Sequence, residues 1–380
     1  MTLTGAWLTH SGTQSLLAGL ENAGFAALCV GGCVRNALLG VPVSDIDIAT
    51  SARPDKVAAI AQALQFRVLP TGIAHGTVTV LARGKPLEVT TFRQDTQTDG
   101  RHAVVAFASD VAVDAARRDF TMNALYADRH GQIIDPLGGL PDLLAAKVRF
   151  VGNPDQRITE DYLRILRFFR FHAHFGDPAQ GIDAEGLAAC AAHADHIPTL
   201  SRERIGAEMR KLLAALDPAP AVASMRQAGV LAQVLPGADT TALAPLVHLE
   251  GDAAPRWLRR LAVIGGENLG ENLRLSRAEL RDLSLVRDNV ATAYTSAALG
   301  WLLNPDLAQD IILARSALLE VPLPQGWRAD IQRGAGAKAP VTAADLQPAF
   351  QNAALGARLK DIQARWLASD LTLSKAELLD

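Results

Sequence analysis

Two aspartates separated by one residue are the first candidates for chemistry in this chain. Asp45 and Asp47 alternate with Ile46 and Ile48, a pattern typical of a short β-strand. Alternate strand positions share a face, so the two carboxylates lie about 7 Å apart along the backbone. Two like charges there need a cation, and hard oxygen ligands with open positions suit Mg²⁺ together with substrate phosphates. The alternative is a polar strand face on which Asp45 caps a turn.

A phosphate-binding turn is predicted shortly before this strand. Residues 28–36 read LCVGGCVRN, an apolar strand followed by two glycines and a helix start. Glycine lets backbone N–H groups approach an anion, the helix N-terminus adds partial positive charge, and Arg35 supplies a full charge. A simple tight turn is the alternative. A phosphate cradle close to a metal-binding pair is the apparatus that nucleotidyl transfer requires.

Both segments closely resemble one family signature. Residues 30–40 (VGGCVRNALLG) and 44–50 (SDIDIAT) resemble the class II tRNA nucleotidyltransferases and bacterial poly(A) polymerases of the polymerase β-like superfamily. The resemblance implies that Asp45 and Asp47 are catalytic Mg²⁺ ligands and that Gly32 and Arg35 bind the nucleotide. Asn36 departs from the family, which usually carries aspartate after the arginine.

Further segments extend the resemblance over about residues 25 to 285, and the second motif of the family is among them. Residues 117–125 (RRDFTMNAL) resemble the family segment that contacts sugar and triphosphate, which assigns Arg118 to nucleotide binding and leaves Asp119 and Asn123 to shape the site. The alternative is a surface turn with a charged cap. Glu88 is a candidate third carboxylate, with a salt bridge as the other interpretation.

A run of arginines and phenylalanines marks residues 160–171 (EDYLRILRFFRF). Arg164, Arg167 and Arg170 recur every three positions and cover roughly a 120° arc of a helix. Buried arginines need anionic partners, and a triphosphate or an RNA phosphate would serve. The stretch resembles the family's nucleotide-selecting motif, which implies that Asp161 and Arg164 read the incoming base. A buried Arg–Asp network joining two helical domains is the alternative.

The elements that must position these residues change in type along the chain. Strand patterns lie at residues 26–30, 46–48, 76–82 and 87–92, with helical stretches at 34–39 and 55–64. We expect residues 92–113 to form a mobile loop. Helical spacing follows in the runs 160–174, 201–215, 219–228, 255–264, 277–294 and 354–366, and a linker is expected at 326–340.

We therefore expect an α+β fold in three parts. A polymerase β-like nucleotidyltransferase head with a small mixed sheet would occupy residues 1–140. A helical neck with nucleotide-selecting and RNA-binding elements would follow at 141–235, and an RNA-binding helical body and tail at 236–380.

Composition limits the function classes. The 380 residues are 49% hydrophobic, which excludes disorder, and a net charge of −3 argues weakly against nonspecific binding of nucleic acid by the whole surface. Three cysteines cannot cross-link so long a chain, and no apolar run reaches the roughly 18 residues of a membrane helix. We expect a cytoplasmic protein without membrane association. Cys190, His193 and His196 lack the second thiolate pair of a structural zinc site.

The resemblance implies template-independent addition of CCA to the 3′ end of tRNA. CTP and ATP would be the substrates, Mg²⁺ the cofactor and pyrophosphate the second product, with no obligate protein partner. A poly(A) polymerase and a partial CC- or A-adding enzyme are the alternatives within the family. A non-catalytic RNA-binding scaffold is the alternative from a different class.

Overall fold

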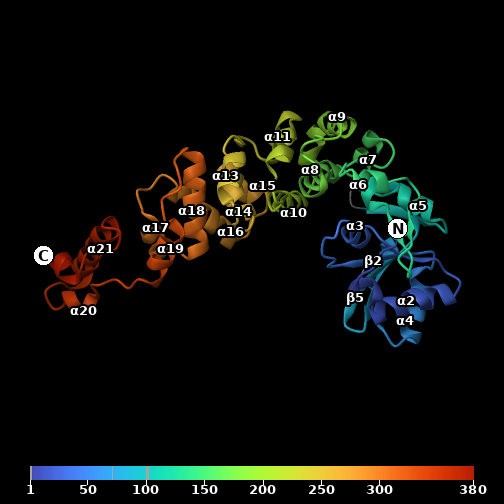
Figure 1. Cartoon of the computed structure of the whole chain (residues 1–380), viewed down its shortest axis with the longest axis horizontal. Helices are drawn as coiled ribbons and strands as arrows, with labels where there is room; N and C mark the ends of the chain where they lie inside the picture. The colour runs from blue at the N-terminus through green and yellow to red at the C-terminus, as the bar shows by residue number, and fades with distance from the viewer. Residues whose placement is uncertain (1, 71, 100–101) are drawn as a thin grey trace. The chain divides into compact units, whose positions relative to one another are not determined.

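The computed structural model describes residues 2–70, 72–99 and 102–380 (Figure 1). The chain divides into two compact units. Unit 1 comprises residues 1–201 and 227–233, and unit 2 comprises residues 202–226 and 234–380. No helix of the described residues has both the length and the apolar content needed to span a membrane.

Unit 1 contains a seven-stranded mixed sheet with the order β3-β4-β5-β2-β1-β8-β9. Only β2 and β5 pair in parallel, and the other neighbours are antiparallel. The strands are β1 (Ala27–Val30), β2 (Ile46–Thr50), β3 (Arg67–Leu69), β4 (Thr77–Ala82), β5 (Lys85–Thr91), β8 (Tyr126–Ala127) and β9 (Ile133–Ile134). The four predicted strands correspond to β1, β2, β4 and β5, which confirms the small mixed sheet.

Helices α2 (Ser11–Asn22) and α4 (Pro54–Ala63) pack on each other and on the strands of this sheet (Figure 1). Leu16, Leu17 and Leu20 form the buried stripe of α2, and Val57 and Ala61 are buried in α4, the three- and four-residue spacing of an amphipathic helix. A short helix α1 (Ala6–Thr9) precedes α2, and α3 (Gly32–Leu38) contacts β1 and β2. The core between helices and sheet holds β2 in place.

Residues 92–113, expected to form a mobile loop, contain regular structure instead. Strands β6 (Arg93–Asp99) and β7 (His102–Phe107) form an antiparallel hairpin, and helix α5 (Val111–Ala116) follows. Residues 100–101 of the predicted loop lie outside the described residues. The prediction was wrong because β6 has a polar sequence with no alternating apolar face, so only backbone pairing identifies it as a strand.

Short helices complete unit 1, and a phenylalanine cluster joins them to the sheet region. The elements are η1 (Ile73–His75), η2 (Thr121–Asn123), α6 (Leu140–Leu144), α7 (Pro154–Glu160), α8 (Leu163–Phe175), α9 (Ala184–Ala192), η3 (Ala194–Thr199) and α12 (Val230–Val234), whose last residue belongs to unit 2. The rings of Phe120 and Phe171 have centroids 4.9 Å apart, and Phe150 stacks on Phe168 at 5.2 Å. Because all four rings are buried, they fix α8 against the segment that follows α5.

Unit 2 is helical throughout its described residues. Its helices are α10 (Arg202–Leu213), α11 (Ala219–Gln227), α13 (Leu243–Glu250), α14 (Trp257–Ile264), α15 (Leu269–Asn272), α16 (Arg277–Asn289), α17 (Ser296–Leu302), α18 (Pro305–Leu318), α19 (Trp327–Gly336), α20 (Ala343–Leu346), α21 (Asn352–Ala368) and α22 (Lys375–Leu379). Arg259 and Arg260 are 1% exposed and pair with Glu250 at 2.7 Å each. Such a buried ionic group must stay complete, since removing one partner leaves a charge without compensation.

The linker expected at residues 326–340 is largely helix. Helix α19 packs closely on α17, and a Cβ atom placed at Gly334 would lie 1.9 Å from the backbone oxygen of Ala297. The glycines that suggest flexibility in the sequence therefore serve close helix–helix contact.

Candidate functional site

The two predicted metal ligands lie at the start of a central strand. Asp47 is the second residue of β2, and Asp45 directly precedes the strand and is exposed. The parallel register of β2 and β5 pairs Asp47 with Glu88. Burial, and then the negative charges of Glu88 and Asp45, raise the pKa of Asp47 to about 6 against the opposing charge of Arg118. The three carboxylates are therefore electrostatic neighbours, and Arg118 is near them.

This donor set fits a divalent cation that takes most of its ligands from water and substrate. Carboxylate oxygens are the ligands that Mg²⁺ prefers, and the ion usually keeps only one or two of them from the protein. Among the residues that the structure describes, no group of three or more His, Cys, Asp or Glu side chains is arranged to hold a metal. The structure thus does not assemble Asp45, Asp47 and Glu88 into a three-ligand site by itself.

The paired glycines form the turn between β1 and α3. Gly31 has φ +72° and ψ −121°, a backbone conformation that side chains disfavour, and its N–H donates to the Leu125 carbonyl at 3.1 Å. A Cβ on Gly31 would lie 3.4 Å from Arg118 Nη1, whereas one on Gly32 would meet only Arg35 Nη2 at 3.8 Å. The turn consequently brings the first glycine, rather than the second, against Arg118.

Arg35 is buried, and the neighbouring protein groups that hold it are uncharged. Its Nε and Nη2 donate to Asn36 Oδ1 at 3.2 and 2.8 Å, and Nη1 donates to Asn123 Oδ1. Its guanidinium carbon lies 4.1 Å from the ring centre of Phe175. Burial lowers the pKa of Arg35 to about 10, an effect that Asp119 opposes. Asn36, where the family usually has aspartate, therefore orients Arg35 without an ion pair.

A hydrogen-bonded chain connects Arg35 to helix α8. Asn123 accepts from Arg35 and donates to Asp119 Oδ1 at 2.9 Å. Asp119 Oδ2 accepts from Arg167 Nε at 2.8 Å. Burial alone would raise the pKa of Asp119, but Arg167, Asn123 and the Phe120 N–H bring it down to about 2. Arg35 of α3 and Arg167 of α8 are thus connected through Asn123 and the Asp119 carboxylate.

Arg118 is held by two buried side chains that the sequence analysis missed. Its Nη2 pairs with Asp114 Oδ2 at 2.9 Å, and its Nε donates to Tyr126 Oη at 3.0 Å. Asp114 also pairs with Arg117 at 2.8 Å. The sequence signal was available, because Asp114 precedes Arg117 and Arg118 by three and four residues, the spacing of ion pairs across one helical turn.

The segment that we predict to read the base lies in the break between α7 and α8. The predicted continuous helix at 160–174 is wrong at this point: Asp161 has extended backbone (φ −158°, ψ 104°), and its Oδ1 accepts from the Leu163 N–H at 3.1 Å. The carboxylate competes with helix continuation by bonding its own neighbouring backbone. Asp161 and Arg164 are therefore placed on two elements, with Arg164 in the first turn of α8.

Arg164 is engaged by protein groups. It pairs with Glu160, and its Nη1 and Nη2 donate to the carbonyls of Arg157 at 2.6 Å and Arg117 at 3.2 Å. Arg157 Nη1 in turn donates to the Ala116 carbonyl at 3.0 Å. Arg157 and Arg164 therefore bond the carbonyls of the last residue of α5, the helix that carries Asp114, and of its C-cap residue, in keeping with the preference of cations for helix C-termini.

The predicted arginine stripe on α8 contacts both carboxylates and an aromatic ring of the protein. Arg164 and Arg167 pair with Glu160 and Asp119, as the alternative interpretation of an Arg–Asp network expects. Arg170 lies with its guanidinium carbon 4.5 Å from the ring centre of Phe171. Arg167 remains 32% exposed, so it combines an internal partner with access to solvent.

The discounted histidines have ordinary partners. His193 Nε2 lies 3.0 Å from Asp155 Oδ1, and His196 stacks on Tyr162 with ring centres 4.4 Å apart. A polar cavity of about 530 Å³ lies elsewhere in unit 1, lined by residues that include Thr121, Arg149 and Asp183. Neither Asp45 nor Asp47 lines it, so the cavity is distinct from the carboxylate site.

Comparisons with known proteins find similarity over several ranges of the chain. A Poly A polymerase head domain matches residues 27–149, and a probable RNA and SrmB-binding site of polymerase A matches residues 181–241. A mitochondrial CCA tRNA nucleotidyltransferase 1 from Homo sapiens is 44% identical over 184 residues, which cover 48% of this chain and 42% of the human protein. The chain thus spans less than half of that relative's length in the alignment.

Two further matches extend over nearly the whole chain. The CCA tRNA nucleotidyltransferase 1 of Danio rerio is 32% identical over 393 residues, covering 93% of this chain and 86% of the relative. The crystal structure of the Bacillus stearothermophilus CCA-adding enzyme in complex with CTP superposes with a TM-score of 0.73 at 29% identity, covering 94% of this chain and 93% of that one. The chain therefore belongs to the family of class II tRNA nucleotidyltransferases and poly(A) polymerases.

Proposed function

We propose that the chain adds C, C and A to the 3′ end of tRNA without a nucleic-acid template, using CTP and ATP. One observation carries the proposal: the carboxylates of Asp45 and Asp47 at the start of β2, with Arg118 beside both them and the Gly31 turn. This combines cation ligands with a positively charged place for a triphosphate. The names of the human and zebrafish relatives and the CTP complex of the bacterial enzyme support the choice of substrates.

In the proposed reaction the 3′ hydroxyl of the RNA attacks the α-phosphorus of the nucleotide. A new oxygen–phosphorus bond forms as the hydroxyl loses its proton to solvent, the bond from the α-phosphorus to the oxygen that bridges to the β-phosphate breaks, and pyrophosphate leaves with the bonding electrons. Asp45 and Asp47 would hold Mg²⁺, with Glu88 as a further carboxylate nearby. When bound, Mg²⁺ supplies activation of the attacking hydroxyl and charge stabilisation of the leaving group.

The basic residues have separate tasks in this proposal. Arg118, Arg35 and the backbone around Gly32 would bind the triphosphate from the head, and Arg167 and Arg170 would bind it from α8. The internal hydrogen bonds that orient Arg35, Arg118 and Arg167 support this role, since oriented donors need little rearrangement when charge develops.

Base choice would depend on Asp161 and Arg164. The carboxylate would accept from an exocyclic amine, and Arg164 would donate to the neighbouring ring nitrogen or carbonyl, a pair of groups that cytosine and adenine both offer. Arg164 Nε makes no hydrogen bond within the described residues, so this donor is available to an incoming base, which supports the proposed role. Substitution of Arg164 by alanine should relax base choice and leave the Mg²⁺ dependence unchanged. Unchanged selectivity would contradict the assignment.

We also propose the division into a head at 1–140, a neck at 141–235 and a body and tail at 236–380, with RNA contacts from neck to tail. The match of residues 181–241 to an RNA-binding segment supports the neck. We further place the protein in the cytoplasm, supported by three cysteines that are all free and buried.

The product of the purified protein tests the proposal. A tRNA lacking its last three nucleotides is incubated with Mg²⁺ and each labelled nucleotide, alone and together, and the extended ends are sequenced. Three added nucleotides of sequence CCA support the proposal. Long adenosine tails identify a poly(A) polymerase, addition that stops at CC or requires a CC end identifies a partial enzyme, and RNA binding without extension identifies a scaffold.

A further inference from the structure

Two buried side chains and the partly exposed Arg118 form a closed hydrogen-bonded triangle next to the Gly31 turn. Arg118 Nη2 pairs with Asp114 Oδ2 at 2.9 Å, Arg118 Nε donates to Tyr126 Oη at 3.0 Å, and Tyr126 Oη donates to the same Asp114 oxygen at 2.8 Å. Asp114 and Tyr126 are both 0% exposed. A planar guanidinium fixed at two nitrogens by two buried partners has one orientation.

That orientation leaves one terminal nitrogen of Arg118 directed at the turn. Nη1 makes no hydrogen bond to any part of the chain that the structure describes, and it lies 3.4 Å from the position of a Cβ on Gly31. Asp114 is shared with Arg117, so two guanidinium groups face a single carboxylate. One net positive charge remains, and the unused donor of Arg118 is on the side of the turn.

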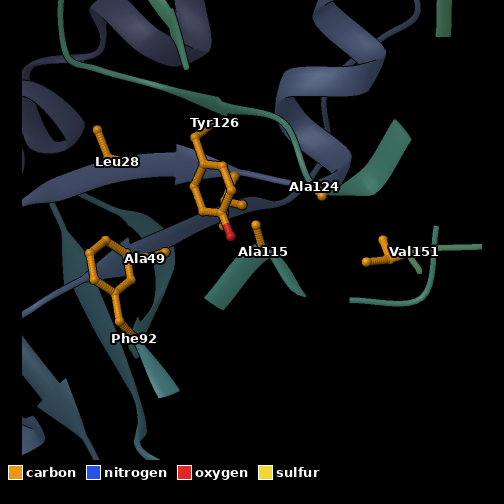
Figure 2. Packing of buried hydrophobic residues seen from close by; sticks show 8 residues of the cluster. Leu28, Ala49, Phe92, Ala115, Ala124, Tyr126 and Val151 are labelled. Atoms are coloured by element: carbon orange, nitrogen blue, oxygen red, sulfur yellow. The ribbon is translucent and has the colours of Figure 1, made fainter. Parts of the chain in front are cut away.

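The Tyr126 ring is positioned by the same strand that ends at the turn. Tyr126 pairs with Val30 across β8 and β1, one residue before Gly31. Figure 2 shows the ring among the buried residues Leu28, Ala49 and Phe92, with its hydroxyl directed toward the segment of Ala115. Strand β1 positions Tyr126 through its pairing with Val30, and it leads directly into the turn at Gly31. The Tyr126 hydroxyl is therefore held at a fixed distance from the turn.

We propose that Asp114 and Tyr126 are positioning residues that lock the Arg118 guanidinium with Nη1 toward the Gly31 turn and thereby set the affinity for the triphosphate of the incoming nucleotide. This inference rests on the proposed function, in which Arg118 binds that triphosphate. A free arginine side chain loses rotamer freedom when it binds a phosphate, and prior locking removes that loss.

Tyr126→Phe tests the inference with the smallest change, since it removes one hydroxyl and keeps the core ring. Dissociation constants for CTP, ATP and inorganic tripolyphosphate are measured by calorimetry with Mg²⁺ and without RNA. We expect all three to rise about fivefold to tenfold, which corresponds to the net contribution of one ordinary hydrogen bond. The kinetic counterpart is a raised KM for both nucleotides with kcat and base choice nearly unchanged. Asp114→Asn should act in the same direction with a larger effect.

Arg118→Ala and the double variant Arg118→Ala/Tyr126→Phe separate positioning from general destabilisation. Removal of the hydroxyl should have no further effect on affinity once Arg118 is absent. Tyr294→Phe, which removes the hydroxyl of a 37% exposed tyrosine in unit 2, is the matched control and should leave the affinities unchanged.

Each outcome decides a different point. Two results overturn the positioning role and leave the proposed function standing. The first is weaker nucleotide binding by Arg118→Ala together with unchanged binding by Tyr126→Phe. The second is an equal loss of affinity when Tyr126→Phe is introduced into the wild type and into Arg118→Ala. Unchanged affinity in Arg118→Ala overturns the inference together with the phosphate role of Arg118. Nucleotide addition itself is judged separately, by the sequence of the extended tRNA.

Discussion

The contacts of the Asp119 carboxylate predict how much its charge contributes to the free energy of unfolding. Its carboxylate accepts from Arg167, Asn123 and the Phe120 backbone, and these contacts hold its pKa at about 2, against an ordinary value of 3.8. Asp119→Asn removes the charge and keeps an acceptor. The depressed pKa corresponds to about 2 kcal/mol of stability for the charged form.

The sign of the pH dependence follows from the direction of the shift. Because the folded pKa lies below the unfolded one, this stabilisation is fully present above pH 3.8 and disappears as the pH falls through about 2. The difference in unfolding free energy between the wild type and Asp119→Asn should therefore be about 2 kcal/mol larger at pH 6 than at very low pH, and should already shrink by about half near pH 3.

The assay must read unit 1 alone, since the chain has two compact units. Urea unfolding followed by pulsed hydrogen–deuterium exchange and mass spectrometry of peptides from residues 1–201 does this. Asp345→Asn in unit 2 is the matched control, because the pKa of Asp345 is also lowered to about 2 while its carboxylate contacts Lys375 and Thr342. It should leave the unfolding of unit 1 unchanged. A wild-type advantage in unit 1 that does not change between pH 6 and pH 3 would refute the assigned role of the Asp119 charge.

Two glycine pairs give further predictions. Gly31→Ala should lower nucleotide affinity at least about tenfold, because alanine adopts φ +72° and ψ −121° only with strain, and relief of that strain would shift the turn that borders Arg118. Gly40→Ala, also at positive φ but with nothing within 4 Å, should not. Equal affinities in a calorimetric titration would contradict this. Gly334→Ala should destabilise unit 2 by about 2 kcal/mol or more through overpacking, whereas Gly336→Ala at the end of the same helix should have little effect in thermal unfolding. Similar melting temperatures for the two would count against the packing argument.

The parts of the fold that the sequence predicted are those with periodic burial. The alternation around Asp45 and Asp47 identified β2, and three- and four-residue spacing identified five helices of unit 2, namely α10, α11, α14, α16 and α21. The hairpin β6–β7 was missed because its residues gave no apolar alternation. The helix at 327–336 was predicted to be a linker because glycine is common both in flexible segments and at close contacts between helices, and the sequence does not distinguish the two.

The sequence predicted which residues belong to the candidate site, but it did not predict their hydrogen-bond and ion-pair partners. The motif around residues 117–125 indicated Arg118, but the partner Tyr126 comes from strand register, which no local pattern encodes. Similarly, the pairing of Arg167 with Asp119 joins residues 48 positions apart. Such contacts depend on the packing of the phenylalanine cluster, and tertiary packing decides them rather than spacing.

The central claim is that Asp45 and Asp47 form the catalytic site, and single-turnover addition of AMP to a tRNA ending in CC tests it most directly. Asp45→Asn and Asp47→Asn, with Glu88→Gln for comparison, are measured over a range of Mg²⁺ concentrations alongside tRNA affinity and thermal unfolding. We predict a loss of at least about a thousandfold in rate for each aspartate variant with tRNA affinity unchanged. Addition at the wild-type rate by either folded aspartate variant would contradict the account.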